Sequence, residues 1–539
     1  MPPANYYLNY FLEMIDTVVQ RYGDILHDDD WSFVNRFKDA NEQAQRLLVR
    51  LLLRKGPLFL VDTLQYAEVP SIEMALVELE TKGLLERNPP VRAFDVIHLL
   101  PVAQSKPLFT DGDRNTRKRD LQSCFEPDTE EKPPADWGCR REIIRPAFRD
   151  AVRRLNLLYF GNEHQSLTEF VLEDIGMMRF ETVPLSPSNR LFSDDREVSM
   201  YIHLNDLRAA FHHMTQCRQF DFLPSLAESL LVIHQGELLK SRFAKVANQV
   251  AYRLEQLGMV DLAARLFATN DLPPSRERQC RIAFKQHRFN DAQTILEAIF
   301  KSPLCADETA FHRRFAPRVY KKTNQPVPQV PILKIKERHE TWQQESGTVE
   351  EVTCAHIDGA IWRENHLPLG IFGLIFWSVI FADVQGVWHH RFQSAPSDLN
   401  EPYFRYRRAS LIEDTLNQSH SVWRNRIVTN WNKKKGIQNP FVHWNTLAIE
   451  ELLSCFDAFS QAQWRGVFAH LLSDIPNHRS GFPDLFVRDE NGGRFIEVKG
   501  PGDRLRDNQN RWLEVFEQLG IKVEVCMVHF AEKCPTPEG

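Results

Sequence analysis

Residues 481–500, "GFPDLFVRDENGGRFIEVKG", contain two short apolar runs separated by a turn-forming segment. Both runs are rich in Phe, Val and Ile and are bounded by Gly or Pro, which is typical of β-strands. The intervening "RDENGG" is typical of a hairpin turn. Asp484, Glu497 and Lys499 place charge inside a pattern that otherwise indicates buried strands. The stretch therefore predicts a β-hairpin whose charged side chains have a chemical function.

Side chains alternate between the two faces of a strand, so Glu497 and Lys499 point to one face while Ile496 and Val498 point to the other. Asp484 begins the first strand, where the same polar face is within reach. We expect two carboxylates and an ammonium group to converge at one end of a small sheet. The alternative is an ordinary surface hairpin that carries a salt bridge.

Such a group suits the hydrolysis of a phosphodiester. Hard divalent ions prefer oxygen ligands, which Asp484, Glu497 and the backbone carbonyl of Val498 supply. A bound metal would polarise the phosphate and acidify a water molecule. Lys499 could position that water or neutralise the charge that develops on the phosphoryl oxygens. The sequence therefore predicts a nuclease site with one or two Mg²⁺ or Mn²⁺ ions.

The residues that follow the hairpin extend this pattern. Gly500 and Pro501 close the second strand, and residues 507–520 show a helical pattern with Asp507 as N-cap and Gly520 as the stop. An apolar strand, "KVEVCMV", comes next. A Pro-Asp pair, then Glu-x-Lys, a helix and a strand is the signature of the PD-(D/E)XK nuclease superfamily.

The segments "SGFPDLFV" and "EVKGPGDRLRDNQNRWLEVFEQLGIKVEVC" resemble the virus-type replication-repair nuclease domain of the Fanconi-associated nucleases. The resemblance implies 5′-flap endonuclease and 5′-to-3′ exonuclease activity of a phosphodiesterase I type, in DNA interstrand crosslink repair. It also implies a metal-binding glutamate ahead of a long apolar helix, a place that Glu364 takes in "WRENHLPLGIFGLIFW". The alternative for Glu364 is an exposed acid at a helix N-terminus.

The predicted fold is multidomain, with a mostly α-helical N-terminal half followed by an α/β PD-(D/E)XK nuclease domain. "YRLEQLGMVDLAARLF" and "IAFKQHRFNDAQTILEAIF" look like offset copies of one helical hairpin, which indicates tetratricopeptide-like repeats; ordinary packed helices are the alternative. The expected parts are a winged-helix-like domain (1–95), a SAP-like DNA-binding element with linker (96–136), the repeats (137–310), a basic linker (311–345) and the nuclease domain (346–539).

Composition indicates the cellular compartment in which the protein is expected to work. The nine cysteines stand singly, which indicates a reducing compartment and no zinc finger, as in a bacterial-type member of the family. Residues 1–16 lack a basic start followed by an apolar core, so we expect no secretory signal. The most apolar stretch is too short and too interrupted to span a bilayer comfortably. We expect a bacterial protein of the cytoplasm that associates with the nucleoid, or a nuclear protein in a eukaryote, without membrane partners.

The net charge of −6 gives no global sign of a nucleic-acid partner, but basic residues cluster locally. Candidates for contact with branched or flapped DNA are Arg479, Arg504, Gln509, Lys433, Lys434 and Lys435. Each has the alternative of a solvated or purely structural side chain. The helical repeats could recruit repair proteins. Two other functions remain open: a non-catalytic DNA-binding scaffold and a Holliday-junction resolvase-type nuclease.

Overall fold

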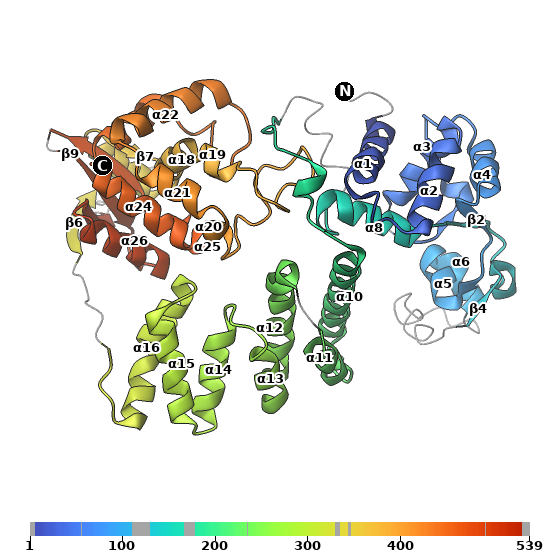
Figure 1. The fold of residues 1–539 in the computed structure, drawn as a ribbon, viewed down its shortest axis with the longest axis horizontal. Helices are drawn as coiled ribbons and strands as arrows, with labels where there is room; N and C mark the ends of the chain where they lie inside the picture. The colour runs from blue at the N-terminus through green and yellow to red at the C-terminus, as the bar shows by residue number, and fades with distance from the viewer. Residues whose placement is uncertain are drawn as a thin grey trace, which may run out of the picture. The chain divides into compact units, whose positions relative to one another are not determined.

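The computed structural model describes residues 6–54, 56–109, 130–165, 178–233, 236–328, 335–342, 347–490 and 492–530. These residues fall into two compact units, each described here by itself. Unit 1 comprises residues 1–179, 184–195 and 388–392, and unit 2 comprises residues 180–183, 196–387 and 393–539. A mostly helical N-terminal half and a C-terminal α/β domain are present as predicted (Figure 1).

Unit 1 begins with helices that surround a small sheet. The helices are α1 (Tyr6–Tyr22), α2 (Asp28–Asp39), α3 (Glu42–Leu52) and α4 (Ile72–Thr81). Ser71 caps α4 through the backbone N–H of Met74, and Gly83 follows the helix with a left-handed φ of +64°. The antiparallel sheet has the order β1 (Phe59–Leu60), β5 (Ile143–Pro146), β2 (Leu85–Arg87). Helices with a small antiparallel sheet form the predicted winged-helix-like arrangement.

The first unit extends beyond the predicted boundary at residue 95. Strand β5 lies between β1 and β2, and α8 (Arg149–Phe160) packs against α1 and α2. Residues 143–160, which we expected in the repeats, therefore belong to unit 1. The physical reason is that Ile143 and Ile144 are fully buried and supply the central strand that joins β1 to β2.

The segment Trp388–Phe392 also belongs to unit 1, although it lies far along the chain. The guanidinium of Arg21 donates hydrogen bonds to the backbone carbonyls of His389 (2.7 Å) and Trp388 (3.2 Å). The ring of His390 stacks on Tyr159. This segment is thus a buried part of unit 1.

The SAP-like element is described only in part. Its described part contains helices α5 (Ala93–Leu99) and α6 (Val102–Phe109), and β3 (Val91–Arg92) pairs with β4 (Glu131–Lys132). Residues 110–129 lie outside the described part of the chain. The DNA-binding role of the element therefore stays a prediction.

Helices in antiparallel pairs open unit 2. They are α10 (Asp195–Cys217), α11 (Leu223–Leu231), α12 (Lys240–Gln256), α13 (Val260–Phe267), α14 (Ser275–Lys285), α15 (Phe289–Lys301) and α16 (Ala306–Thr323). The main pairs are α12 with α13, α14 with α15 and α15 with α16. Ala263 and Ala292, the matching small residues of the two repeat copies, are both fully buried. The helical hairpins predicted from the sequence are therefore present.

Five strands form the nuclease sheet within the described part of the chain. Their order is β6 (Lys336–Trp342), β10 (Lys522–Phe530), β9 (Gly492–Lys499), β8 (Leu485–Asp489), β7 (Ala360–Trp362). Strand β10 runs parallel to β6 and β9, whereas β8 is antiparallel to β9 and β7. The predicted β-hairpin is β8–β9, and its second strand lies in the middle of the sheet.

The prediction of a basic linker over residues 311–345 was wrong for most of its length. Residues up to Thr323 continue α16, and Lys336–Trp342 form the edge strand β6. Side chains in β6 alternate between exposed and half-buried positions, and an edge strand accommodates such a polar sequence. Only the segment between these two elements remains as a connection.

Helices complete the nuclease domain. They are α17 (Val349–His356), α18 (His366–Ile375), α19 (Trp377–Ile380), α20 (Phe404–Arg407), α21 (Ala409–Leu416), α22 (His420–Lys434), α23 (Ile449–Asp457), α24 (Gln461–Ser473), α25 (Ile475–His478) and α26 (Asp507–Gln518). The long apolar stretch forms α18 and α19 inside the main core, as predicted. Trp423 and Trp431 are buried in the same core, so they are not free to stack on bases. Among the described helices, none is long and apolar enough to cross a membrane.

Candidate active site

The β8–β9 hairpin brings the predicted charged residues together. Leu485 pairs with Ile496 in the antiparallel register, so Asp484, one residue earlier, lies at the level of Glu497. Asp484 Oδ2 accepts a hydrogen bond of 2.8 Å from the backbone N–H of Val498. The carboxylate of Asp484 is therefore fixed against the central strand, as the alternation of side chains predicted.

Lys499 and Glu497 form a buried ion pair on the same strand. Lys499 Nζ lies 2.5 Å from Glu497 Oε1 and donates a 3.1 Å hydrogen bond to the backbone carbonyl of Val498. Glu497 is 0% exposed, and its Oε2 has no hydrogen-bond partner among the residues that the structure describes. A buried carboxylate oxygen without a partner is costly, so this atom is available for a cation.

Burial shifts the proton equilibria of both acids. Desolvation raises the pKa of Asp484 to about 6, although the Val498 N–H and the Lys499 charge oppose that rise. Desolvation and the neighbouring charge of Asp484 raise the pKa of Glu497 to about 8, against the pull of Lys499. The raised pKa values mean that the ionised form of each carboxylate is destabilised. A divalent cation bound beside them would stabilise these ionised forms.

Glu364 approaches the hairpin through its backbone. It follows β7, adopts a left-handed φ of +42°, and its N–H donates a 3.1 Å hydrogen bond to the backbone carbonyl of Asp484. Such a conformation is strained for a residue other than glycine and persists only where the surroundings hold it. The exposed carboxylate of Glu364 also raises the pKa of Asp484 through charge repulsion. The structure thus brings Glu364 next to the first acid of the hairpin.

A second acid close to the hairpin escaped the sequence analysis. Glu350, in the first turn of α17, raises the pKa of both Asp484 and Glu497 by charge repulsion. The sequence signal is weak, because α17 is short and lies more than a hundred residues before the hairpin. Only the packing of α17 against the sheet brings Glu350 near the two acids.

The donor set fits a hard divalent metal. Glu364, Asp484, Glu497 and the Val498 carbonyl offer oxygen ligands, and Glu497 Oε2 is buried without a partner. In the described part of the chain, however, no three His, Cys, Asp or Glu side chains stand together as a ready-made metal cage. A divalent cation bound here would compensate the negative charges of Asp484 and Glu497, which repel each other.

The loop that leads into Asp484 is fixed by α26. Gly481 has a φ of +94°, and a Cβ at this position would lie 2.7 Å from backbone atoms of Asn508. Phe482 stacks on Trp512 with ring centroids 3.8 Å apart, and the Trp512 indole N–H donates to the carbonyl of His478. His478 is buried in α25. The position of the Pro-Asp pair therefore depends on the helix that follows the hairpin.

The predicted DNA contacts near the hairpin have different surroundings. Arg504 is exposed. Arg479 donates a 3.0 Å hydrogen bond to the Pro440 carbonyl, and the Gln509 side-chain oxygen accepts from the Arg506 N–H at the start of α26. Arg506, rather than Asp507, is the N-cap of that helix. The side chains of Arg479 and Gln509 thus make hydrogen bonds within the protein, which gives each a structural role.

The three lysines of the predicted basic cluster also differ. Lys434 lies 2.6 Å from Glu181 in an ion pair, and the Lys435 ammonium lies 5.7 Å from the ring centroid of Trp431. Lys433 is exposed at the end of α22. Of the three, Lys433 is the one most readily available to a phosphate.

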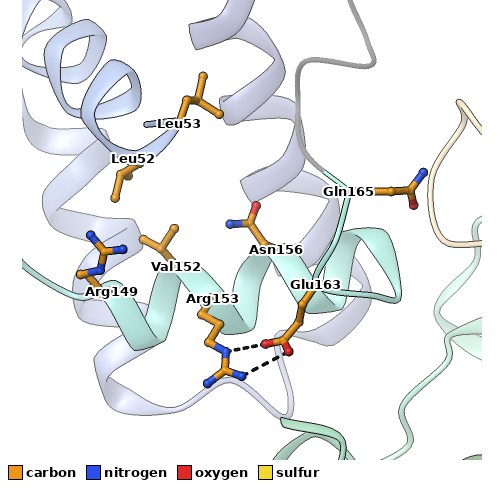
Figure 2. A pocket seen from close by; sticks show the side chains of 8 residues that line it. All are labelled: Leu52, Leu53, Arg149, Val152, Arg153, Asn156, Glu163 and Gln165. Atoms are coloured by element: carbon orange, nitrogen blue, oxygen red, sulfur yellow. Dashed lines mark hydrogen bonds and ion pairs between the residues drawn. The ribbon is translucent and has the colours of Figure 1, made fainter. Parts of the chain in front are cut away.

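A pocket of about 250 Å³ lies within unit 1 (Figure 2). Arg153 in its wall is paired with Glu163, and Arg149 donates to the Gly56 carbonyl. Leu52, Leu53 and Val152 contribute apolar surface (Figure 2). Both arginines are engaged within the unit, and none of the hairpin acids lines this pocket.

Comparisons with known proteins agree with this geometry. A family model described as VRR-NUC domain matches residues 419–530, and one described as FAN1, HTH domain matches residues 5–86. The Fanconi-associated nuclease 1 homolog of Pseudomonas aeruginosa is 34% identical over 559 residues, which cover 98% of this chain and 97% of that protein. The chain belongs to the Fanconi-associated nuclease family.

Other members of the Fanconi-associated nuclease family match along nearly the whole chain. A crystal structure of paFAN1 bound to 2nt 5′-flap DNA with a gap has a TM-score of 0.86 and 32% identity, covering 99% of this chain and 100% of that one. Human Fanconi-associated nuclease 1 is 24% identical over 97% of this chain and 62% of its own length. The protein is a structure-selective DNA nuclease, a DNA-cleaving hydrolase that depends on divalent metal, and not a non-catalytic scaffold.

Proposed function

We propose that the protein is a 5′-flap endonuclease with 5′-to-3′ exonuclease activity of a phosphodiesterase I type, acting near branch points in DNA interstrand crosslink repair. The convergence of Asp484, Glu497 and Lys499 at one end of the β8–β9 hairpin is the observation that carries this proposal. The matched paFAN1 structures hold DNA with a 1nt or a 2nt 5′ flap, which supports a flap substrate.

Glu364, Asp484, Glu497 and the Val498 carbonyl would hold one or two Mg²⁺ or Mn²⁺ ions. When bound, the metal supplies Lewis-acid activation of the scissile phosphate and of a water molecule. Lys499 Nζ, held within 3.1 Å of both Glu497 Oε1 and the Val498 carbonyl, would orient the attacking water or stabilise negative charge on the phosphoryl oxygens. The buried position of Lys499 keeps its ammonium group aimed at this space.

Recognition would rely on the shape and the backbone of the DNA rather than on its bases. Arg504 and Lys433 are the exposed candidates for phosphate contacts, with Arg479, Gln509, Lys434 and Lys435 in supporting positions. We propose residues 346–539 as the nuclease domain and the winged-helix-like and SAP-like parts as duplex-binding parts. The helical repeats would contact repair proteins, and the site of action would be the bacterial nucleoid.

The direct test is cleavage of a labelled 5′-flap oligonucleotide with Mg²⁺ or Mn²⁺ by Asp484→Asn and Lys499→Ala variants. We expect the rate to fall at least about a hundredfold for each, because loss of residues that merely support a metal ligand already costs about 10–100-fold. Glu490→Gln, an acid at the exposed turn of the same hairpin, is the matched control and should cleave as the wild type does.

EDTA provides the second arm of this test. Cleavage by the wild type should stop with EDTA and return with added Mn²⁺, while flap binding persists. Cleavage at the wild-type rate by Asp484→Asn would remove this site from the mechanism. Preference for four-way junctions over flaps would instead favour the resolvase-type alternative.

A further inference from the structure

The turn that carries Glu364 and the loop that carries Asp484 are joined by two hydrogen bonds. The Glu364 N–H donates to the Asp484 carbonyl at 3.1 Å, and the side-chain oxygen Oδ1 of Asn365 accepts from the Phe482 N–H at 3.1 Å. The two bonds run in opposite directions. Each segment therefore supplies one donor and one acceptor, which restrains their separation more than a single bond would.

These bonds continue the ladder between β7 and β8. Trp362 pairs with Leu485, and in the same antiparallel register Asn365 stands opposite Phe482. The backbone carbonyl of Asn365 is already used, because it accepts the N–H of Leu369 where the chain turns into α18. The side chain of Asn365 thus supplies the last acceptor of the ladder after the backbone has entered the helix.

Asn365 does not use its side chain in the way that is typical of its position. It is the N-cap of α18, where an asparagine oxygen commonly accepts from an N–H of the first helical turn. The Asn365 side chain makes no such bond within α18 and is bonded to the loop before β8 instead. The half-buried amide therefore joins two segments that lie far apart in the chain.

The contact between Asn365 and Phe482 acts close to Asp484. Pro483 has no N–H, so the Phe482 N–H is the last backbone donor of the loop before Asp484. The Phe482 side chain is buried, and an unpaired N–H in such surroundings is costly. Loss of the Asn365 oxygen would leave this donor unpaired and would release the loop from the turn of Glu364.

We infer that Asn365 is a positioning residue of the nuclease site, whose side chain holds the turn of Glu364 and the loop of Asp484 together so that both carboxylates serve one metal centre. This inference rests on the proposed function, because it takes Glu364 and Asp484 as metal ligands. In this role Asn365 touches neither the metal nor the DNA. Its removal should change metal affinity and the chemical step and leave substrate binding intact.

The test measures metal binding as well as cleavage. Full-length, metal-stripped protein is titrated calorimetrically with Mn²⁺ in the absence of DNA, and flap cleavage is followed at saturating Mn²⁺. Asn365→Ala should weaken Mn²⁺ binding and lower kcat, each at least about tenfold, because loss of a group that orients a metal ligand costs about 10–100-fold. KM for the flap should stay within about twofold, since no substrate contact is removed. Asn365→Asp keeps an acceptor oxygen at the same place, so its kcat should stay within about threefold of the wild type.

Asn270→Ala in the helical repeats is the matched control. The Asn270 side-chain oxygen also accepts a backbone N–H, that of Leu272 at 3.1 Å, and Asn270 is half-buried as Asn365 is. This variant should lose stability but keep the Mn²⁺ affinity and kcat of the wild type. Unfolded protein lowers the number of binding sites and not the affinity of the folded ones, so calorimetry separates positioning from loss of fold. If Asn365→Ala does not fold, Asn365→Ser carries the same expectations, because it keeps a capping hydroxyl on a shorter side chain.

The outcomes distinguish this inference from the proposed function. Wild-type Mn²⁺ affinity and kcat in Asn365→Ala, with binding lost in Asp484→Asn, would overturn the role of Asn365 alone. A kcat of Asn365→Asp as low as that of Asn365→Ala would also overturn it, because the acceptor oxygen would then not be the group that matters. Wild-type Mn²⁺ binding no stronger than that of Asp484→Asn would overturn the proposed function as well.

Discussion

Glu497 is fully buried, and burial together with the charge of Asp484 raises its pKa to about 8 even though Lys499 lies 2.5 Å away. A single ammonium group therefore does not compensate the loss of solvation. The orphan Oε2 and the raised pKa have the same cause, namely a carboxylate placed where only a cation can satisfy it. The Glu497 side chain that would bind a cation is therefore also the side chain whose buried charge destabilises the folded protein.

This cost predicts a pH dependence of stability in metal-free protein. The pKa of Glu497 rises from 4.5 to about 8 on folding, so the folded state binds the proton more tightly than the unfolded state does. The stabilising contribution of the proton is complete below about 4.5 and is lost as the pH rises through about 8. In EDTA, the gain in unfolding free energy of Glu497→Gln over the wild type should therefore be small below pH about 4.5 and grow to at least about 1 kcal/mol near pH 8, the equivalent of about one pKa unit.

Urea unfolding at several pH values measures this difference. Glu490, at the turn of the same hairpin, gives the control: Glu490→Gln should follow the wild-type curve because this acid is exposed. Saturating Mn²⁺ should reverse the order, since only the wild type then keeps the ligand. Curves for the wild type and Glu497→Gln that run parallel from acid to neutral pH would contradict the assigned role of burial.

At the scale of elements, the position of Asp484 depends on contact between the loop before β8 and helix α26. The left-handed Gly481 lets the loop pass against the backbone of Asn508, and Phe482 stacks on Trp512. The helix and the hairpin thus position the acid together. The contact bears on Asp484 because this residue lies just before β8 and not within the strand.

Gly481→Ala tests this contact. We expect a loss of stability and a fall in flap cleavage, because the new Cβ would lie 2.7 Å from the Asn508 backbone and would push the Pro-Asp pair away from β9. Gly502→Ala is the control: its φ of +85° brings similar backbone strain, about 1–2 kcal/mol, but a Cβ there meets nothing within 4 Å. Equal cleavage rates for the two variants would show that the loop contact does not set the position of Asp484.

At the scale of the whole molecule, the chain does not divide into successive blocks of sequence. Unit 1 includes β5, α8 and the segment Trp388–Phe392. The repeats and the nuclease sheet lie in unit 2. Burial of Ile143 and the hydrogen bonds from Arg21 explain why these pieces belong where they do. Parts of unit 1 on both sides of the repeats must therefore be made before that unit is complete.

Gly161→Ala should disturb this assembly. Gly161 has a φ of +65°, and a Cβ there would overlap the ring of His389. We expect unit 1 to lose more than the roughly 1–2 kcal/mol of backbone strain alone, with faster proteolysis near residue 389. Gly56→Ala, at a φ of +102° with nothing within 4 Å of its Cβ, gives the strain without the overlap. Identical melting and proteolysis of both variants would exclude a structural role for the His389 contact.

The hairpin was predictable because its information is local. Alternation in "RFIEVKG" placed Glu497 and Lys499 on one face, and the turn between the strands fixed the partner strand. The repeat helices were predictable for a similar reason, since small residues recur at matched places. The boundaries at residues 95 and 137 and the linker over residues 311–345 could not be placed correctly, because β5 and β6 form strands only through partners far away in the chain.

The sequence by itself determined the kind of chemistry: two carboxylates and a lysine on a strand face, together with the family whose motifs they share. The tertiary structure alone decided how deeply the acids are buried and which charges surround them. The approach of Glu350, the strained backbone of Glu364 and the orphan oxygen of Glu497 arise from packing between distant elements. Spacing along a chain specifies which side chains share a strand face, whereas desolvation and charge repulsion depend on what surrounds them in space.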